Sequence, residues 1–138
     1  MSDSSSSRKI RKLYPLIRWG NLLLLRASLS NQQELRIVQL LLDTGSSFTV
    51  LPSDVLTEIG CDLQKPEQQV SVIAAGGMIR APKAIVPQFN CLGHGIENFS
   101  VVALDLPTRS PAAGLLGMDF LITIGAVINV KKGEILLS

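Results

Sequence analysis

The residues best suited to chemistry are an aspartate and the turn after it, in the stretch QLLLDTGSSFTVLP at residues 39–52. Three leucines lead into Asp43, so a carboxylate ends an apolar segment, where ionisation is costly unless hydrogen bonds satisfy it. Gly45 allows a sharp turn that brings its own N–H close to the carboxylate. The Ser46 hydroxyl is also placed to donate to the carboxylate, and Thr44 can fix the loop through its hydroxyl. The stretch predicts an aspartate held rigidly at the base of a cleft.

An ordinary turn explains the same residues, because Asp, Thr, Gly and Ser are all favoured in turns. From average composition, Asp-Thr-Gly is expected by chance in roughly 3 % of chains of this length. The triplet is therefore suggestive by itself, and the rest of the chain has to distinguish a catalytic loop from a simple turn.

Two other patterns could bind a ligand, and both are weak. Cys91-Leu-Gly-His94 has the local spacing of metal ligands, but it supplies only two of them, so neither a metal nor a cofactor is expected. Gly76-Gly77 could belong to a phosphate-binding loop, but the following Lys-Ser/Thr and the strand-to-helix setting of such loops are missing.

The composition describes a chain of about one domain, with 138 residues, 46 % apolar and 17 % charged, against a usual charged share of roughly 25 %. So little polar surface is typical of a well-packed protein or of one that hides surface in an oligomer. A net charge of +2 without basic-aromatic interleaving gives no support for nucleic-acid binding. The LLLL run at residues 22–25 is too short to span a bilayer, and no signal peptide is recognisable. We expect no membrane partner, a cytoplasmic location, and free thiols at Cys61 and Cys91.

The elements that must position these residues are mostly strands. Short apolar runs bounded by turn residues predict strands at residues 22–28, 36–42, 47–51, 70–74, 78–81, 84–89, 99–104, 127–130 and 134–137. One short helix is expected from Pro52 to just before Gly60, and another is expected from Met118 to Gly125. Residues 1–12 are expected to form a flexible, Ser-rich and basic arm, and residues 13–138 are expected to form a single domain. The predicted fold class is all-β, compact and mostly antiparallel, with one or two short helices.

Three features occur in the order found in aspartic proteases of the retroviral, or retropepsin-like, type, which the chain resembles from about Leu22 to Ser138. The first is the apolar strand that leads into Asp43-Thr44-Gly45. The second is a glycine-tipped hairpin, Ala74-Ala75-Gly76-Gly77-Met78, at the place of the substrate-covering flap, although an ordinary hairpin has the same pattern. The third is Leu115-Leu116-Gly117 before a short helix, a segment that lies beside the catalytic loop in that family.

The resemblance implies an acid-protease half-barrel and a mechanism in which two aspartates share one proton and activate a water molecule, without a cofactor. No other aspartate of this chain is followed by Thr-Gly or Ser-Gly, neither Asp3 and Asp54 nor Asp62, Asp105 and Asp119. One copy therefore carries half an active site. The implied enzyme is a C2 homodimer, with Asp43 of each subunit at the axis and the Thr44 hydroxyls bonded across it.

Two functions fit this reading: an aspartic endopeptidase that hydrolyses an extended peptide or protein substrate, and a catalytically silent dimerisation or peptide-binding module of the same fold. The intact Asp43-Thr44-Gly45 favours the endopeptidase, because a binding module does not need a desolvated carboxylate. A hydroxyl donor at Ser46, where retroviral members usually carry alanine, predicts a more acidic pH optimum. The hairpin at residues 127–138, which continues beyond the end of the retroviral enzymes, predicts a rearranged dimer interface. This end of the chain resembles the cellular and bacterial relatives more closely.

Overall fold

The computed structural model describes residues 11–64, 68–74 and 77–138. Most of the predicted N-terminal arm, residues 1–10, and the hairpin tip at Ala75 and Gly76 lie outside the described residues. The strands are β1 (Lys12–Pro15), β2 (Ile17–Trp19), β3 (Leu22–Ser30), β4 (Leu35–Leu42), β5 (Val50–Leu51), β6 (Gln69–Ala74), β7 (Gly77–Cys91), β8 (His94–Ala103), β9 (Gly114–Leu116), β10 (Val127–Asn129) and β11 (Glu134–Leu137), and the helices are α2 (Ser53–Glu58) and α3 (Met118–Ile124).

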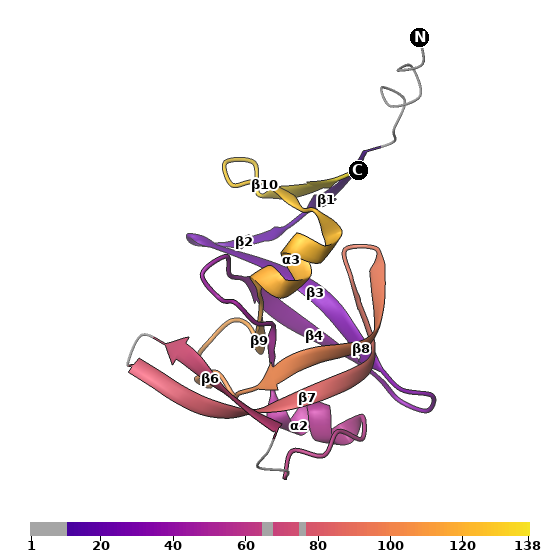
Figure 1. The fold of residues 1–138 in the computed structure, drawn as a ribbon. Helices are drawn as coiled ribbons and strands as arrows, with labels where there is room; N and C mark the ends of the chain where they lie inside the picture. Colours follow the sequence, from indigo (N-terminus) through magenta and orange to yellow (C-terminus); the bar gives the residue numbers. More distant parts are fainter. Residues whose placement is uncertain (1–10, 65–67, 75–76) are drawn as a thin grey trace.

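Six strands close into a barrel in the order β3-β4-β9-β5-β8-β7, because β3 pairs with β7 as well as with β4 (Figure 1). The pairs β4–β9 and β5–β8 are parallel, and the other neighbours in the barrel are antiparallel. The predicted all-β, mostly antiparallel fold is confirmed. Among the described residues, no helix combines the length and the apolar character that crossing a bilayer requires.

Two predicted strands are in fact one long strand, β7, which runs through two prolines. Pro82 is the residue at which β7 stops pairing with β6, since the pairing with β8 starts at Lys83. The register with β8 skips Pro87, which lies opposite Asn98, a residue with a φ of 54°. Proline has no N–H to give to a ladder, so a strand accepts it only where no such bond is needed. Pro82 lies where the pairing partner changes and Pro87 lies at a skipped position of the ladder, so β7 continues through both prolines.

The barrel interior is closed at one end by α3. Phe120 of this helix packs edge-on against Phe89 and Phe99, with ring centroids 5.3 Å and 5.9 Å apart. Aromatic pairs prefer this geometry and add stability beyond the burial of their area. The three rings hold α3 in one place, and this fixes the helix start that lies beside the Asp43 loop.

A second, three-stranded sheet has the order β1-β11-β10, with β11 in the centre. Lys12, expected in the flexible arm, begins β1 and pairs with Leu137. Ile135 and Leu137 are buried against the core, and Figure 1 shows this sheet on the far side of α3 from the barrel. The C-terminal hairpin therefore forms as predicted and pairs with the chain's own N-terminal strand.

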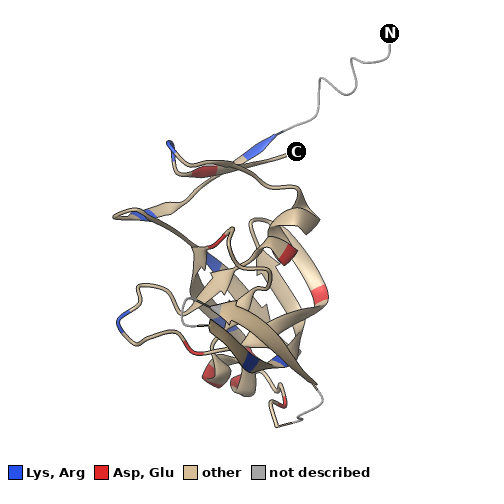
Figure 2. Ribbon diagram, turned by 60° about the vertical axis from the view of Figure 1, so that its left-hand side comes forward, with Lys and Arg blue, Asp and Glu red and all other residues tan. Residues whose placement is uncertain are grey.

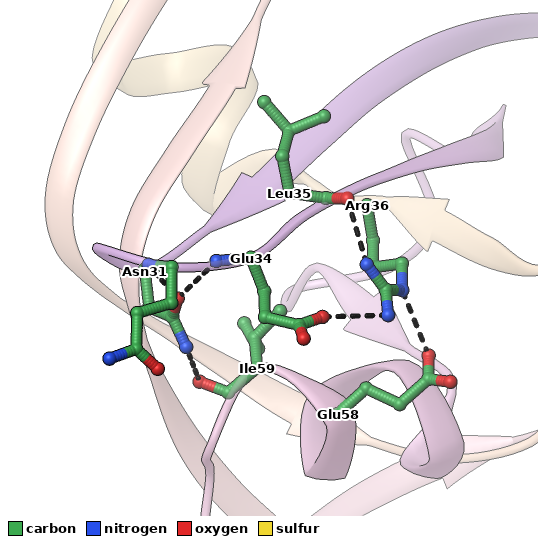
Figure 3. Close-up of polar contacts among 7 residues, drawn as sticks. Asn31, Glu34, Leu35, Arg36, Glu58 and Ile59 are labelled. Carbon is green, nitrogen blue, oxygen red and sulfur yellow. Dashed lines mark hydrogen bonds and ion pairs between the residues drawn. The ribbon is translucent and has the colours of Figure 1, made fainter.

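The β3–β4 turn is fastened to the end of α2 (Figure 3). Asn31 Nδ2 donates to the Ile59 carbonyl at 2.8 Å, and the Arg36 guanidinium contacts Glu34 at 2.7 Å and Glu58 at 3.3 Å. These ion pairs are well exposed, so each contributes less than about 1 kcal/mol. The contacts keep α2 against the wall of the barrel, away from the Asp43 loop.

Candidate active site

Asp43 follows the last residue of β4, and its backbone extends the pairing of that strand. The Asp43 N–H donates to the Leu116 carbonyl at 3.0 Å, directly after the parallel pairing of Leu42 with Leu116. The Gly45 N–H donates to Asp43 Oδ1 at 2.9 Å, as predicted, and the Ser46 N–H donates to the Asp43 carbonyl at 3.1 Å. Asp43 itself is half-buried, and Thr44 and Gly45 are exposed. The loop thus holds one carboxylate oxygen and opens towards solvent.

The role predicted for the Ser46 hydroxyl is wrong. Ser46 Oγ donates to the Phe48 carbonyl at 2.7 Å, and a hydroxyl has one proton to donate. Ser46 therefore supports the loop from within, two residues along its own chain, and leaves the Asp43 carboxylate to the Gly45 N–H. The more acidic pH optimum expected from a Ser46 bond to the carboxylate loses its physical basis.

Leu115, Leu116 and Gly117 lie beside the loop, as expected. Leu116 is fully buried, and Gly117 has room for no side chain at all. A Cβ on Gly117 would lie 2.5 Å from both the C and the O of Phe48, and a Cβ on Gly114 would lie 2.1 Å from the Val50 carbonyl oxygen. A Cβ cannot lie so close to backbone atoms. Only glycine at these two positions therefore allows the segment to pass against the backbone of Phe48 and Val50.

Two residues that the sequence reasoning did not select, Thr49 and Asp119, join the loop to α3. Thr49 is fully buried, and its N–H and hydroxyl donate to the two oxygens of Asp119 at 2.9 Å and 2.8 Å. The Gly117 N–H donates back to Thr49 Oγ1 at 3.2 Å. A polar residue in each of two otherwise apolar segments was the available signal, because buried polar groups occur in hydrogen-bonded pairs.

The backbone of the helix start is tied to the same loop. The Met118 N–H donates to the Ser46 carbonyl at 2.8 Å, and the Asp119 N–H donates to the Ser47 carbonyl at 3.3 Å. Ser46, Ser47 and Thr49 are thus occupied in bonds to α3, which explains why the strand expected at residues 47–51 is only the two-residue β5. The first turn of α3 and the Asp43 loop form one rigid unit.

The predicted hairpin forms from β6 and the start of β7, with Ile73 opposite Met78 and Ala74 opposite Gly77. One of its strands and the Asp43 loop form the walls of a cleft of about 240 Å³. The walls come from Gly45, Ser46, Ser47 and Phe48 on one side and from Ser71, Val72 and Ile73 on the other. None of these side chains carries a charge. A larger cavity of about 430 Å³ lies elsewhere, between α2 and the loop after β8.

Neither cysteine has the properties of a nucleophile. Burial raises the pKa of the Cys91 thiol to about 12 and also raises the pKa of Cys61. Both thiols therefore stay protonated at neutral pH, and it is the thiolate that reacts. His94 Nδ1 lies 3.0 Å from the carbonyl of Leu92, and no group of three or more potential metal ligands occurs within the described ranges.

Comparison with known proteins agrees with this geometry. The model of the aspartyl protease family matches residues 28–120, from β3 to the middle of α3. A retropepsin-like aspartic protease from Rickettsia conorii has a similar crystal structure, with a TM-score of 0.66 and 22 % sequence identity over 93 % of this chain and 89 % of that one. None of the curated proteins matches the chain. The family match includes the Asp43 loop, the hairpin and the segment at Leu115–Gly117.

Proposed function

The chain belongs to the aspartyl protease family, and from this premise we propose that it is an aspartic endopeptidase, active as a homodimer. The observation that carries the proposal is the state of Asp43. Its carboxylate accepts the Gly45 N–H through Oδ1. Within the described part of the chain, Oδ2 has no hydrogen-bond partner. A carboxylate with one oxygen held and the other free, in the same loop as the cleft-lining Gly45 and Ser46, is suited to binding a water molecule.

Two such carboxylates, one from each subunit, form the catalytic pair. They share a single proton, because two like charges a few ångströms apart cannot both be ionised. The ionised aspartate takes a proton from water, which attacks the scissile carbonyl carbon, and the protonated aspartate donates a hydrogen bond to the carbonyl oxygen. The tetrahedral intermediate collapses when the leaving amine takes a proton from the pair, so no covalent acyl-enzyme forms.

We place the second carboxylate on another copy, because no other aspartate of the chain is followed by Thr-Gly or Ser-Gly, and no other described aspartate lines the cleft beside the Asp43 loop. Each of these other described aspartates accepts from a backbone N–H: Asp54 from Val55, Asp62 from Gln64, Asp105 from Ser53 and Asp119 from Thr49. Asp3 lies outside the described residues. Thr44 is exposed beside Asp43, so its hydroxyl is available to bond across a twofold axis.

The substrate we propose is an extended peptide that lies between the loop and the β6–β7 hairpin, which acts as the flap. The β6 strand is at the edge of its sheet, so its outer backbone groups are free to pair with a peptide strand. Phe48 and Val72 line the cleft without a neighbouring charge, and this favours apolar side chains next to the cleaved bond. Closure of the flap would exclude water from the reaction.

The test is cleavage of a peptide library between acidic and neutral pH by the wild-type protein, by Asp43→Asn and by Asp105→Asn. Asp43→Asn keeps the shape of the side chain and removes its charge, so activity should fall by at least about a thousandfold. Asp105 is exposed and makes one backbone hydrogen bond far along the chain from the loop, so Asp105→Asn should retain wild-type activity. Cleavage that persists in Asp43→Asn would refute the assignment. A wild-type dimer that binds peptides without cleaving any would instead indicate the silent module.

A further inference from the structure

Three turns of the molecule present large apolar side chains to solvent. Trp19, at the β2–β3 turn, is 61 % exposed, Val130 of the β10–β11 turn is 65 % exposed, and Met78, near the tip of the hairpin, is 68 % exposed. In Figure 1 the β2–β3 and β10–β11 turns project from the side of the molecule on which the loop after β4 also lies, and in Figure 2 these two turns lie next to each other at the upper left. Leu22 pairs with Trp19 across the β2–β3 turn and is partly exposed as well.

Two of these turns are held together as one piece. Arg18 Nη2 donates to the carbonyls of Val130 and Lys131 at 2.7 Å and 3.2 Å, and the Leu16 N–H donates to the Gly133 carbonyl at 2.8 Å. Neighbouring side chains of a strand point to opposite faces, so Arg18 faces the β10–β11 turn and Trp19 faces away from it. The indole is therefore presented on a fixed support, and binding there needs little ordering of the backbone.

The terminal sheet limits how a second copy can bind. The β11 strand pairs with β1 along one edge and with β10 along the other. Both edges of β11 are thus filled by its own chain, and the open edges of this sheet belong to β1 and β10. A dimer built around Asp43 would therefore not use an edge of β11, and exposed apolar side chains on the side where the Asp43 loop opens are the contacts it can use.

Resting on the function proposed above, we propose that a second copy of this chain docks on this side and that Trp19 is the anchor of the interface. In an interface with a C2 axis beside Asp43, both subunits contribute the same surface, and the turns on that side are part of it in our proposal. Tryptophan is enriched among the residues that dominate interface affinity. A bound peptide is the weaker candidate, because Trp19 is not among the residues that line the cleft. Lys131 and Lys132 are exposed in the same turn as Val130, so this turn belongs to the polar rim of the interface.

The test uses the fact that Trp19 is the sole tryptophan of the sequence. Its emission is recorded while the wild-type protein is diluted from high micromolar to nanomolar concentration, and dimer dissociation is measured in parallel by sedimentation. The emission should shift to the red on dilution, with the same midpoint as dissociation. Trp19→Ala should weaken the dimer by about 30-fold or more. Ile37→Ala, at an apolar residue that is 67 % exposed on β4, should leave the dissociation constant within threefold.

The contrary results separate this proposal from the peptidase assignment. A cleaving dimer whose Trp19 emission stays that of an exposed indole, or a Trp19→Ala dimer of wild-type strength, would overturn the docking surface alone. A dimer with a buried Trp19 that cleaves nothing would overturn the peptidase assignment alone. A wild-type protein that is monomeric at every concentration would overturn both. The dilution series needs no variant, so it decides the question even if Trp19→Ala does not fold.

Discussion

Asp119→Ala should destabilise the protein strongly, although Asp119 is not part of the proposed catalytic pair. The change leaves the N–H and the hydroxyl of Thr49 without their acceptors, which now lie at 2.9 Å and 2.8 Å. Thr49 is 0 % exposed, so water cannot replace the lost carboxylate. A buried donor without a partner costs about 1–3 kcal/mol, and two donors together cost about 2–6 kcal/mol. The free energy of unfolding of a small domain is about 5–15 kcal/mol, so this loss is a large fraction of it.

The measurement is urea unfolding at a single protein concentration, because the stability of a dimer depends on concentration. Asp105→Ala is the matched control: it removes an exposed carboxylate that accepts one bond, from the Ser53 N–H at 2.8 Å. This control removes a single exposed hydrogen bond at the start of a helix, so it should lower the free energy of unfolding by about 1 kcal/mol. If Asp119→Ala unfolds within 1 kcal/mol of the wild type, the claim that Thr49 depends on this carboxylate is refuted.

A double-mutant cycle separates the pair from general damage to the loop. Thr49→Val removes the hydroxyl and also deprives the Gly117 N–H of its acceptor. The hydroxyl left unpaired by Asp119→Ala is absent from the double variant, which should therefore cost less than the sum of the single variants, by about 1–3 kcal/mol. Strict additivity would mean that the two side chains act independently.

Two further predictions follow from glycine packing and from a buried thiol. Gly117→Ala should cost about 3 kcal/mol in urea unfolding, because its Cβ would lie 2.5 Å from the backbone of Phe48. Gly20→Ala, with no atom within 4 Å but a φ of +59°, should cost only about 1–2 kcal/mol of backbone strain. Burial raises the pKa of Cys91 from 9.0 to about 12, so the unfolded chain loses this proton first as the pH rises. Through this thiol the free energy of unfolding should fall by about 1.4 kcal/mol per pH unit between pH 9 and 12. Cys91→Ala should remove this contribution, whereas Cys61, whose pKa burial also raises, keeps its own.

Two parts of the site could be predicted: the contact of Gly45 with the Asp43 carboxylate, and the position of the segment that ends at Gly117. Glycine at Gly45 was expected to bring an N–H to the Asp43 carboxylate, and that bond is present. The apolar segment ending at Gly117 was expected beside the loop, and the Asp43 N–H bonds to its Leu116 carbonyl. The first expectation came from local pattern, because glycine allows the turn that brings its N–H to the carboxylate. The second came from the resemblance to the retropepsin-like family.

The parts that could not be predicted depend on choices between equivalent partners. The Ser46 hydroxyl can reach either a carboxylate or the Phe48 carbonyl, and the spacing in the sequence is compatible with both. The link between Thr49 and Asp119 spans 70 positions, so it becomes visible only when parallel pairing of β4 with β9 brings the segments together. The long β7 strand was predicted as two strands, 78–81 and 84–89, divided at Pro82, because the ladder partner that tolerates this proline is also distant in sequence.

The hydrogen bonds of the site explain how the Asp43 loop can be stable within a single chain. Ser46, Thr49 and Asp119 all direct their polar groups into the same chain, so the loop is rigid before any second copy arrives. What remains open is a short stretch: the exposed Thr44 and the carboxylate of Asp43, with only one oxygen held by Gly45. Since rigid, pre-positioned groups lose little entropy on association, the same arrangement suits both the pairing and the catalysis that we propose. Substitutions at Thr49 or Asp119 should therefore weaken dimerisation and hydrolysis together, whereas Asp43→Asn should abolish hydrolysis and leave the fold of each subunit intact.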